Sequence, residues 1–293
     1  MNKIVKMMYM GFFLLIAITL DCKAEEMLQI RGSDTMLNVV QELVEVYMEK
    51  NPDQPIALTG GGSGTGISGL RNRTVDIANS SRDMTGREKI DLKSKGVEPS
   101  LIVIGMDCIT IVVNKNNKVN KLTTGQLGAI FRGDILNWKD LGGDDMPISL
   151  YGRQSNSGTF FLFRERILKG DYAYEMRQMN GNSQIVEAIK QDASGIGYVG
   201  RGYVSQNQDV KVVSIATELS AEYINPLEIT FANASKYPIV RTLNQFVGGK
   251  PEGAIGDFLK FELSDEGQKI IEDMGFLKIT EETMRQNNQV LAD

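Results

Sequence analysis

The sequence has no histidine, and only two cysteines and one tryptophan among its 293 residues. The absence of histidine excludes a Ser-His-Asp triad, an imidazole general base and His-ligated zinc. Two cysteines without a C-x-x-C pair do not build a disulfide scaffold. Basic residues are outnumbered by acidic ones, 32 against 37, and the net charge of −5 argues against nucleic acid as a partner.

Long apolar runs are also few, and the first of them extends from Met7 to Leu20 behind two lysines. This pattern is typical of an export signal and is too short for a comfortable membrane span. Cleavage after Ala24 competes with lipidation of Cys22, and an uncleaved anchor is a third outcome. Residues 1–24 are therefore predicted to be a signal peptide or lipoprotein signal. The rest of the chain is expected in the periplasm, and we slightly favour the form tethered through Cys22.

Strand-like and helical patterns alternate in the first part of the exported body. Apolar side chains recur at helical spacing in 35–53, and short apolar segments flank this stretch. The predicted order is strand 27–31, that helix, strand 55–60, a glycine-rich loop at 60–66, a short helix 67–74 and strand 75–81. This alternation with short loops predicts an α/β fold with a largely parallel sheet.

An apolar, β-branched run from Leu101 to Asn114 is too long for one ordinary strand. A chain that crosses between two domains would have this pattern. Cys108 lies inside the run, where a small buried hydrophobe is a simpler interpretation than a reactive thiol. Trp138, the only tryptophan, is predicted to pack in a turn rather than to stack on a sugar.

Four loops rich in Gly, Ser and Thr follow predicted strands: GSDTM at 32–36, GGGSGTG at 60–66, NSSRD at 79–83 and RQSNSGT at 153–159. In open parallel sheets, ligands bind beyond the carboxyl ends of the strands, where such loops gather. Helix N-termini and close backbone amides donate to an anion there, and hydroxyls add donors without charge. Helix capping explains any single loop. The four together favour an oxyanion site, because Arg153 adds a bidentate donor.

A nucleotide loop is a weaker interpretation of the glycine run. No G-x-x-x-x-G-K-[ST] sequence occurs, so the lysine of a P-loop is missing. A G-x-G-x-x-G match begins at Gly64, but it follows the second predicted strand, and a run so rich in glycine matches by chance. The acidic pairs do not have calcium-loop spacing. We therefore expect no metal and no other cofactor.

Several longer segments carry a family resemblance. They are GSDTM, GGGSGTGISGL, TVDIANSSRDM, LTTGQLGAIFRGDILNWKDLGG followed by ISLYGRQSNSGTFFLF, GIGYVG, YPIVRTL and FLKFELSDEGQKIIEDMGF. In this order they cover nearly the whole exported body. The sequence resembles the periplasmic phosphate-binding proteins of bacterial phosphate ABC importers.

This resemblance implies a two-lobed, type II Venus-flytrap fold, in which each lobe has a mostly parallel sheet flanked by helices and two hinge strands join the lobes. Lobe one would comprise 25–106 and 239–293, and lobe two 107–238. The implied function is high-affinity binding of inorganic phosphate in the cleft and its delivery to an ABC permease of the inner membrane. Hinge closure without catalysis, by a monomer, is expected.

The resemblance also implies the residues that bind phosphate. From lobe one these are Thr35, Met36 and Ser63, which would donate from backbone or hydroxyl groups. From lobe two, Arg153 would clamp two oxygens, and the start of the following helix would donate through Ser157, Gly158 and Thr159.

One position departs from the family. Relatives often have an aspartate where Ser81 stands, and that carboxylate accepts the proton of hydrogen phosphate and so rejects sulfate. Here the acceptor could be Ser81, Asp34 or Asp107. We favour Asp107, because a carboxylate inside an apolar strand is costly without a purpose. Arg82 is expected at the surface or the cleft rim, with a second phosphate ligand as the alternative.

Three other functions remain open. A receptor for sulfate or molybdate is the nearest alternative. An exported phosphatase with a serine nucleophile would need a base, and no lysine lies beside Ser63 or Ser157. A scaffold or adhesion protein that keeps the fold without the ligand is the third.

Overall fold

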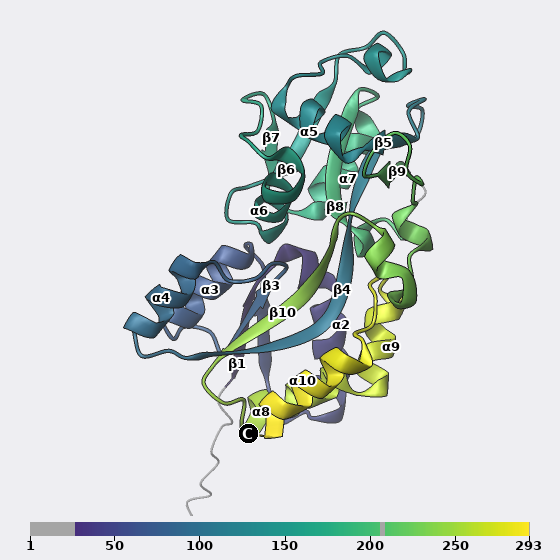
Figure 1. The fold of residues 1–293 in the computed structure, drawn as a ribbon. Coiled ribbons are helices and arrows are strands. Elements are labelled where there is room, and N and C mark those ends of the chain that lie inside the picture. The colour runs from purple at the N-terminus through teal and green to yellow at the C-terminus, as the bar shows by residue number, and fades with distance from the viewer. Residues whose placement is uncertain (1–26, 206–208, 293) are drawn as a thin grey trace, which may run out of the picture.

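A computed structural model describes residues 27–205 and 209–292. The predictions for residues 1–24, including cleavage after Ala24 and lipidation of Cys22, lie outside the described residues. Figure 1 shows a two-lobed α/β molecule, and we call the part that carries β1–β3 lobe one and the part that carries β5–β9 lobe two. Lobe one lies below lobe two in this view.

The sheet of lobe one is built around three parallel strands. Alternate side chains of β1 are buried, as the two-residue period of a strand requires. Its strands, in spatial order, are β2 (Ile56–Thr59), β1 (Leu28–Gly32), β3 (Ile77–Ser80), β10 (Val240–Gly248) and β4 (Pro99–Asn114), of which β10 is antiparallel to both neighbours. Its helices are α2 (Asp34–Lys50), α3 (Ser63–Arg71), α4 (Gly86–Ser94), α8 (Gly253–Leu263), α9 (Asp265–Asp273) and α10 (Glu281–Ala292).

Lobe two continues the sheet from the second half of β4. The strand β8 (Gly195–Gly200) is antiparallel to β4, and β6 (Ser149–Arg153) and β7 (Arg177–Met179) follow in parallel order. On the other side, β9 (Val210–Ala216) pairs with β4 and with β5 (Lys121–Thr123). Its helices are α5 (Thr124–Arg132), α6 (Gly158–Phe163), which continues into a π-helix at Arg164–Leu168, and α7 (Asn182–Gln191).

Strands β4 and β10 connect the two lobes. The amino-terminal half of β4 pairs with β10, and its carboxyl-terminal half pairs with β8 and β9. The prediction that the run 101–114 crosses between two domains is therefore confirmed. Cys108 is fully buried in this strand, and burial raises the pKa of its thiol to about 12, as expected of a structural cysteine.

The glycine run folds differently from the prediction. Helix α3 begins at Ser63 and not at Ile67, because the loop ends at Gly62, whose φ of 94° favours glycine. This earlier start places the Ser63 side chain in the first turn of the helix.

Each lobe has its own hydrophobic core. One large cluster holds Leu127, Phe131 and Tyr198 of lobe two, and another holds Met36, Leu43 and Phe258 of lobe one. Trp138 is fully buried in the first of these clusters, and its Nε1 donates to the Ser194 carbonyl oxygen at 2.9 Å, which confirms the packing role.

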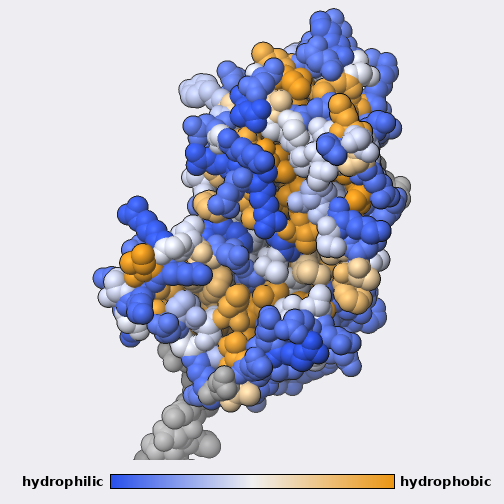
Figure 2. Space-filling model, viewed as in Figure 1, coloured by the Kyte–Doolittle hydropathy of each residue, from blue (hydrophilic) through white to orange (hydrophobic). Residues whose placement is uncertain are grey.

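Among the described residues, no helix has the length and hydrophobicity that a membrane span needs. Hydrophilic side chains cover most of the face in Figure 2, with hydrophobic ones in smaller groups on both lobes.

Glu262 on α8 is a buried acid in the core of lobe one. Its Oε1 accepts a hydrogen bond from Gln245 Nε2 at 3.0 Å, while Oε2 has no partner among the described residues. Burial raises the pKa of Glu262 well above its usual value. A carboxyl group whose pKa rises on folding stabilises the protein fully below its unfolded pKa, and this stabilisation is lost as the pH rises towards the folded pKa.

We therefore expect Glu262→Gln to stabilise the protein at neutral pH by about 1 to 3 kcal/mol, because an amide is neutral without taking up a proton on folding and adds a donor. Thermal unfolding from acid to neutral pH measures this effect. The gain should shrink below the unfolded pKa of the carboxyl group. Glu266→Gln, on the exposed face of α9, is the matched control. A gain that did not change with pH would contradict the assignment.

Candidate functional site

Hydroxyl groups from both lobes meet where strands β1, β2, β3 and β6 end. Thr35 Oγ1 at the start of α2 lies 3.1 Å from Thr159 Oγ1 at the start of α6. The Ser63 hydroxyl at the start of α3 lies 3.5 Å from the Ser81 hydroxyl, which follows β3. Gly158 packs against this second pair, since a Cβ atom there would lie 2.7 Å from Ser81 Oγ. All five residues come from the predicted site.

Local hydrogen bonds fix three of these loops. Ser63 Oγ accepts from the Ser81 backbone N–H at 3.1 Å, which joins two loops of lobe one. Ser157 caps α6, and its Oγ accepts from the Thr159 N–H at 3.2 Å. Met36 is fully buried, and its N–H donates to the Ser33 carbonyl oxygen at 3.1 Å.

Arg153, at the end of β6, is the charged residue on the lobe-two side of the site. Its Nη2 donates to Asp34 Oδ2 and to the Asn180 carbonyl oxygen at 2.9 Å. The side chain is only 2% exposed, yet Nε and Nη1 are buried without a hydrogen-bond partner among the described residues. Two unpaired N–H groups on a buried cation are costly unless an acceptor occupies the space beside them.

Asp34 connects the lobes. Its carboxylate pairs with Arg153 and accepts the Gly61 N–H at 3.1 Å, and its carbonyl oxygen accepts from the Tyr203 hydroxyl. Asp34 lies on α2 of lobe one, whereas Arg153 and Tyr203 belong to lobe two. The structure thus gives Asp34 an interlobe ion pair that the sequence did not indicate.

Asp107 is fully buried on β4. Its Oδ2 accepts from Arg241 Nε at 2.9 Å and Nη2 at 2.7 Å, and its Oδ1 accepts from the Arg201 N–H at 2.8 Å. Burial raises the pKa of Asp107, while Arg241 and the Arg201 N–H oppose that shift. Protein donors therefore already occupy both of its oxygens.

The glycine loop contacts the opposite lobe directly. Gly64 N donates to the Asn156 carbonyl oxygen at 3.0 Å, and Asn156 Nδ2 donates to the Gly61 carbonyl oxygen at 2.8 Å. A Cβ atom at Gly62 would lie 2.8 Å from that same Asn156 oxygen. Glycine lets the two backbones approach each other here.

The sequence matches a model of the PBP superfamily domain over residues 21–266. The phosphate-binding protein PstS of Pseudomonas aeruginosa is 32% identical over 266 residues, which is 85% of this chain and 81% of that protein. The chain belongs to the family of phosphate-binding proteins PstS, within the PBP superfamily. The phosphate-binding protein PstS of Bacillus subtilis is 31% identical and covers 96% of this chain and 95% of its own length.

A solved structure in the same family has a closely similar fold. It is a putative phosphate ABC transporter substrate-binding protein from Clostridium perfringens with bound phosphate, with a TM-score of 0.77 and 28% identity. It covers 87% of this chain and 100% of its own. An ABC-type phosphate transport receptor from Vibrio cholerae, with a TM-score of 0.68 and 27% identity, covers 86% of this chain and 100% of its own.

Arg241 on β10 is a residue of this hydroxyl cluster that the sequence interpretation missed. Its Nη1 donates to Thr159 Oγ1 at 2.8 Å and its Nη2 to Thr35 Oγ1 at 3.2 Å. A charged residue in the apolar segment YPIVRTL was the available signal, and the argument used for Asp107 applies to it equally.

Arg82 lies less exposed than the sequence suggested. Its side chain is 8% exposed, pairs with both oxygens of Glu88 at 2.7 and 2.8 Å, and lies over the Phe161 ring at 5.1 Å. Phe161 belongs to lobe two, so this cation–π contact also joins the lobes.

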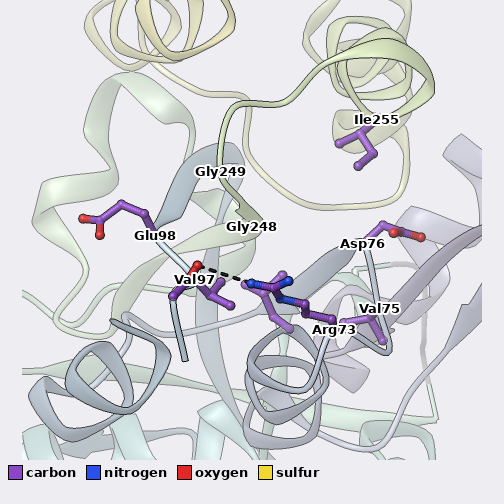
Figure 3. Close-up of a pocket in the computed structure, with 10 residues that line it drawn as sticks. Arg73, Val75, Asp76, Val97, Glu98, Gly248, Gly249 and Ile255 are labelled. Carbon is purple, nitrogen blue, oxygen red and sulfur yellow. Dashed lines mark hydrogen bonds between the residues drawn. The ribbon is translucent and has the colours of Figure 1, made fainter. Parts of the chain in front are cut away.

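A separate hollow of about 490 Å³ lies at the opposite end of lobe one, beside Arg73, Asp76 and Glu98 (Figure 3). Arg73 and Asp76 precede β3, whereas Ser81 follows it, so this hollow is distinct from the hydroxyl cluster. In residues 27–205 and 209–292, no group of three acidic, cysteine or histidine side chains could hold a metal ion.

The Asn156 side chain makes a hydrogen bond between the two lobes. We expect Asn156→Ala to weaken binding of inorganic phosphate, the ligand of the family, by about two- to tenfold, because one interlobe hydrogen bond is lost. Calorimetric titration measures the change. The control is Asn233→Ala in lobe two. Asn180 is less suitable as a control, because its side chain hydrogen-bonds to Gln154. An unchanged affinity would show that this contact does not contribute to closure.

Proposed function

We propose that this protein binds inorganic phosphate between its lobes and delivers it to an ABC permease outside the cytoplasm. The observation that carries this proposal is Arg153, a buried cation with two unpaired N–H groups next to hydroxyls from both lobes. Family membership supports phosphate as the anion.

The proposed site draws on both lobes. Lobe one contributes hydroxyl and backbone groups, and lobe two contributes the arginine and the start of α6. The proposed contacts are Thr35, Met36, Ser63 and Ser81 from lobe one and Arg153, Ser157, Gly158 and Thr159 from lobe two. An anion that contacts both sets stabilises the closed form, which is the form a permease could distinguish from the open one.

We propose lobe boundaries at 25–106 with 239–293 for lobe one and 107–238 for lobe two. The hydrophobic clusters support them, because one cluster draws almost all its residues from between Cys108 and Ile239. The other draws its residues from before Gly105 and after Val240.

Three side chains could accept the proton of the ligand, and they differ in how many of their acceptor atoms already bind protein donors. Asp107, which we favoured from the sequence, already accepts hydrogen bonds from Arg241 and Arg201. This supports a role in which Asp107 holds other residues of the site and does not contact the ligand. Asp34 likewise accepts from Arg153 and Gly61. The Ser81 hydroxyl is then the acceptor that we propose.

A hydroxyl can also donate, so Ser81 should discriminate less sharply than a carboxylate does between hydrogen phosphate and sulfate. Competition calorimetry with phosphate, sulfate and arsenate tests this, on the wild type and on Asp107→Asn and Ser81→Asp. We expect Ser81→Asp to increase the preference for phosphate over sulfate. If sulfate binds better than phosphate, the protein is a sulfate receptor and the proposal is wrong.

We further propose that the protein does not catalyse a reaction. A serine hydrolase would need a base next to Ser63 or Ser157, whereas their hydroxyls hydrogen-bond to Ser81 and to backbone N–H groups. Hydrolysis of a phosphomonoester that Ser157→Ala abolished would contradict this. We also propose that the protein is exported and monomeric. Its signal is either cleaved after Ala24 or lipidated at Cys22, and mass spectrometry of the mature chain distinguishes the two outcomes.

A further inference from the structure

Arg241 and Asp107 form a buried pair between the two hinge strands. They are directly opposite in the β4–β10 register. Arg241 is 4% exposed and Asp107 is fully buried. Two of the guanidinium nitrogens, Nε and Nη2, donate to the same carboxylate oxygen of Asp107, which fixes the plane of the guanidinium.

The outer edge of that guanidinium contacts one threonine from each lobe. Nη1 donates to Thr159 Oγ1 at 2.8 Å and Nη2 to Thr35 Oγ1 at 3.2 Å. A guanidinium has donors and no acceptor, so both threonine oxygens accept in these contacts. Their hydroxyl hydrogens must therefore point away from Arg241.

A hydroxyl without such a partner could either donate to phosphate or accept a proton from it. With an Arg241 N–H on each oxygen, one lone pair of Thr35 and one of Thr159 are occupied, and both O–H groups are directed away from the arginine as donors. They can donate to each other across 3.1 Å, and when an acceptor is present, both can donate to it. An unprotonated phosphate oxygen is a stronger acceptor for these hydroxyls than a P–OH oxygen, and the dianion has three unprotonated oxygens where the monoanion has two.

Packing keeps the Thr35 hydroxyl in this orientation. A Cβ atom at Gly200 would lie 2.8 Å from Thr35 Cγ2 and 3.1 Å from Asp107 Oδ2. The methyl group of Thr35 therefore fits closely against the Gly200 backbone, beside the carboxylate. An exchange of the methyl and hydroxyl positions would break the bond to Arg241.

We infer that Arg241, held by Asp107, is a positioning residue that orients the hydroxyls of Thr35 and Thr159 as donors towards the anion and so gives the site a preference for the dianion of phosphate over the monoanion. This inference rests on the proposed phosphate-binding function. It assigns the ion pair to specificity, and not to direct contact with the ligand.

The ionisable groups that face Arg241 are ion-paired, apart from the Cys108 thiol. Asp107, Arg153 and Cys108 are the groups whose charges act on it. The pKa of Cys108 is raised to about 12, so its thiol remains neutral at neutral pH. Asp34 is paired with Arg153, and Arg82 with Glu88.

The test is calorimetric titration of inorganic phosphate across its second ionisation. The variants are the double substitution Asp107→Leu with Arg241→Met, the single variant Thr159→Val and all three changes combined. Replacing a buried pair with apolar side chains of similar volume usually preserves folding. We expect wild-type affinity to rise with pH, and the double variant to bind the dianion about tenfold more weakly with a flatter pH profile.

The thermodynamic cycle separates positioning from packing. Thr159→Val should lower the phosphate affinity of the wild type about tenfold. In the double variant without the ion pair it should lower the affinity clearly less, because the Thr159 hydroxyl is then no longer oriented. Equal losses in both backgrounds would overturn the inference. If the double variant does not fold, Thr159→Val and Thr35→Val decide alone, and an unchanged pH profile in both overturns it. Failure of the wild type to bind phosphate would instead overturn the proposed function itself.

Discussion

Arg153→Met should weaken phosphate binding by about a hundredfold to a thousandfold, since a buried charge partner is removed. The variant loses the two N–H groups that have no protein partner, Nε and Nη1. It also leaves the Asp34 carboxylate close to the anion without its counter-charge. Both effects act against the ligand, so this substitution should have the largest effect of any single change at the site.

Two further variants make this prediction specific. Arg164→Met removes an exposed arginine of lobe two that pairs with Asp171, and it should bind phosphate as the wild type does. Arg153→Lys keeps a positive charge without the planar fork, and we expect intermediate affinity. Calorimetric titration of the three proteins measures the differences. Near-normal affinity in Arg153→Met would show that the anion binds elsewhere.

Gly158→Ala should weaken phosphate binding by at least about tenfold while it leaves the stability of each lobe nearly unchanged. A Cβ atom at this position would lie 2.7 Å from Ser81 Oγ and 3.2 Å from Arg82 Cγ. Those atoms belong to lobe one, whereas Gly158 belongs to lobe two. The added methyl group therefore obstructs closure of the cleft rather than folding.

Gly125→Ala is the matched control for Gly158→Ala. Gly125 is also near the start of a helix in lobe two, but its nearest neighbour to a new Cβ is at 3.8 Å, an ordinary contact. Small-angle X-ray scattering with phosphate should show an open form for Gly158→Ala and a closed form for the control. A large drop in the melting temperature of Gly158→Ala would mean that the clash affects folding instead.

Local sequence patterns predicted the parts of the site that depend on local structure. Strands followed by Gly, Ser and Thr gave the loops at Thr35, Ser63, Ser81 and Ser157, because strand ends and helix caps follow from nearby residues. The family resemblance added the two-lobed architecture and the role of Arg153. The crossing of the segment 101–114 between two domains was predicted from its length and β-branched composition, whereas its folding as the single strand β4 was not.

Contacts that depend on pairing between distant segments were not predictable in this way. Arg241 reaches Thr159 and Thr35 only because β10 pairs with β4 in one register, which places it opposite Asp107. The Asp34–Arg153 pair likewise joins residues far apart in the chain. A charged residue in an apolar strand indicates a buried partner, but it does not identify that partner.

The glycine run illustrates the same difference at one helix end. The helix was predicted from Ile67, where apolar periodicity begins, but it starts at Ser63. Glycine and serine have modest helix propensity, and the tertiary contact with Asn156 stabilises this first turn. Contacts with the opposite lobe thus shape the loop.

The most direct test of the account is a crystal structure of the exported body grown with phosphate. The account predicts one tetrahedral anion between the lobes, within hydrogen-bond distance of Arg153 Nε and Nη1 and of the hydroxyls of Ser63, Thr35 and Thr159. Arg241 should remain paired with Asp107. Phosphate bound elsewhere, with these two Arg153 nitrogens still unpaired, would contradict the central claim.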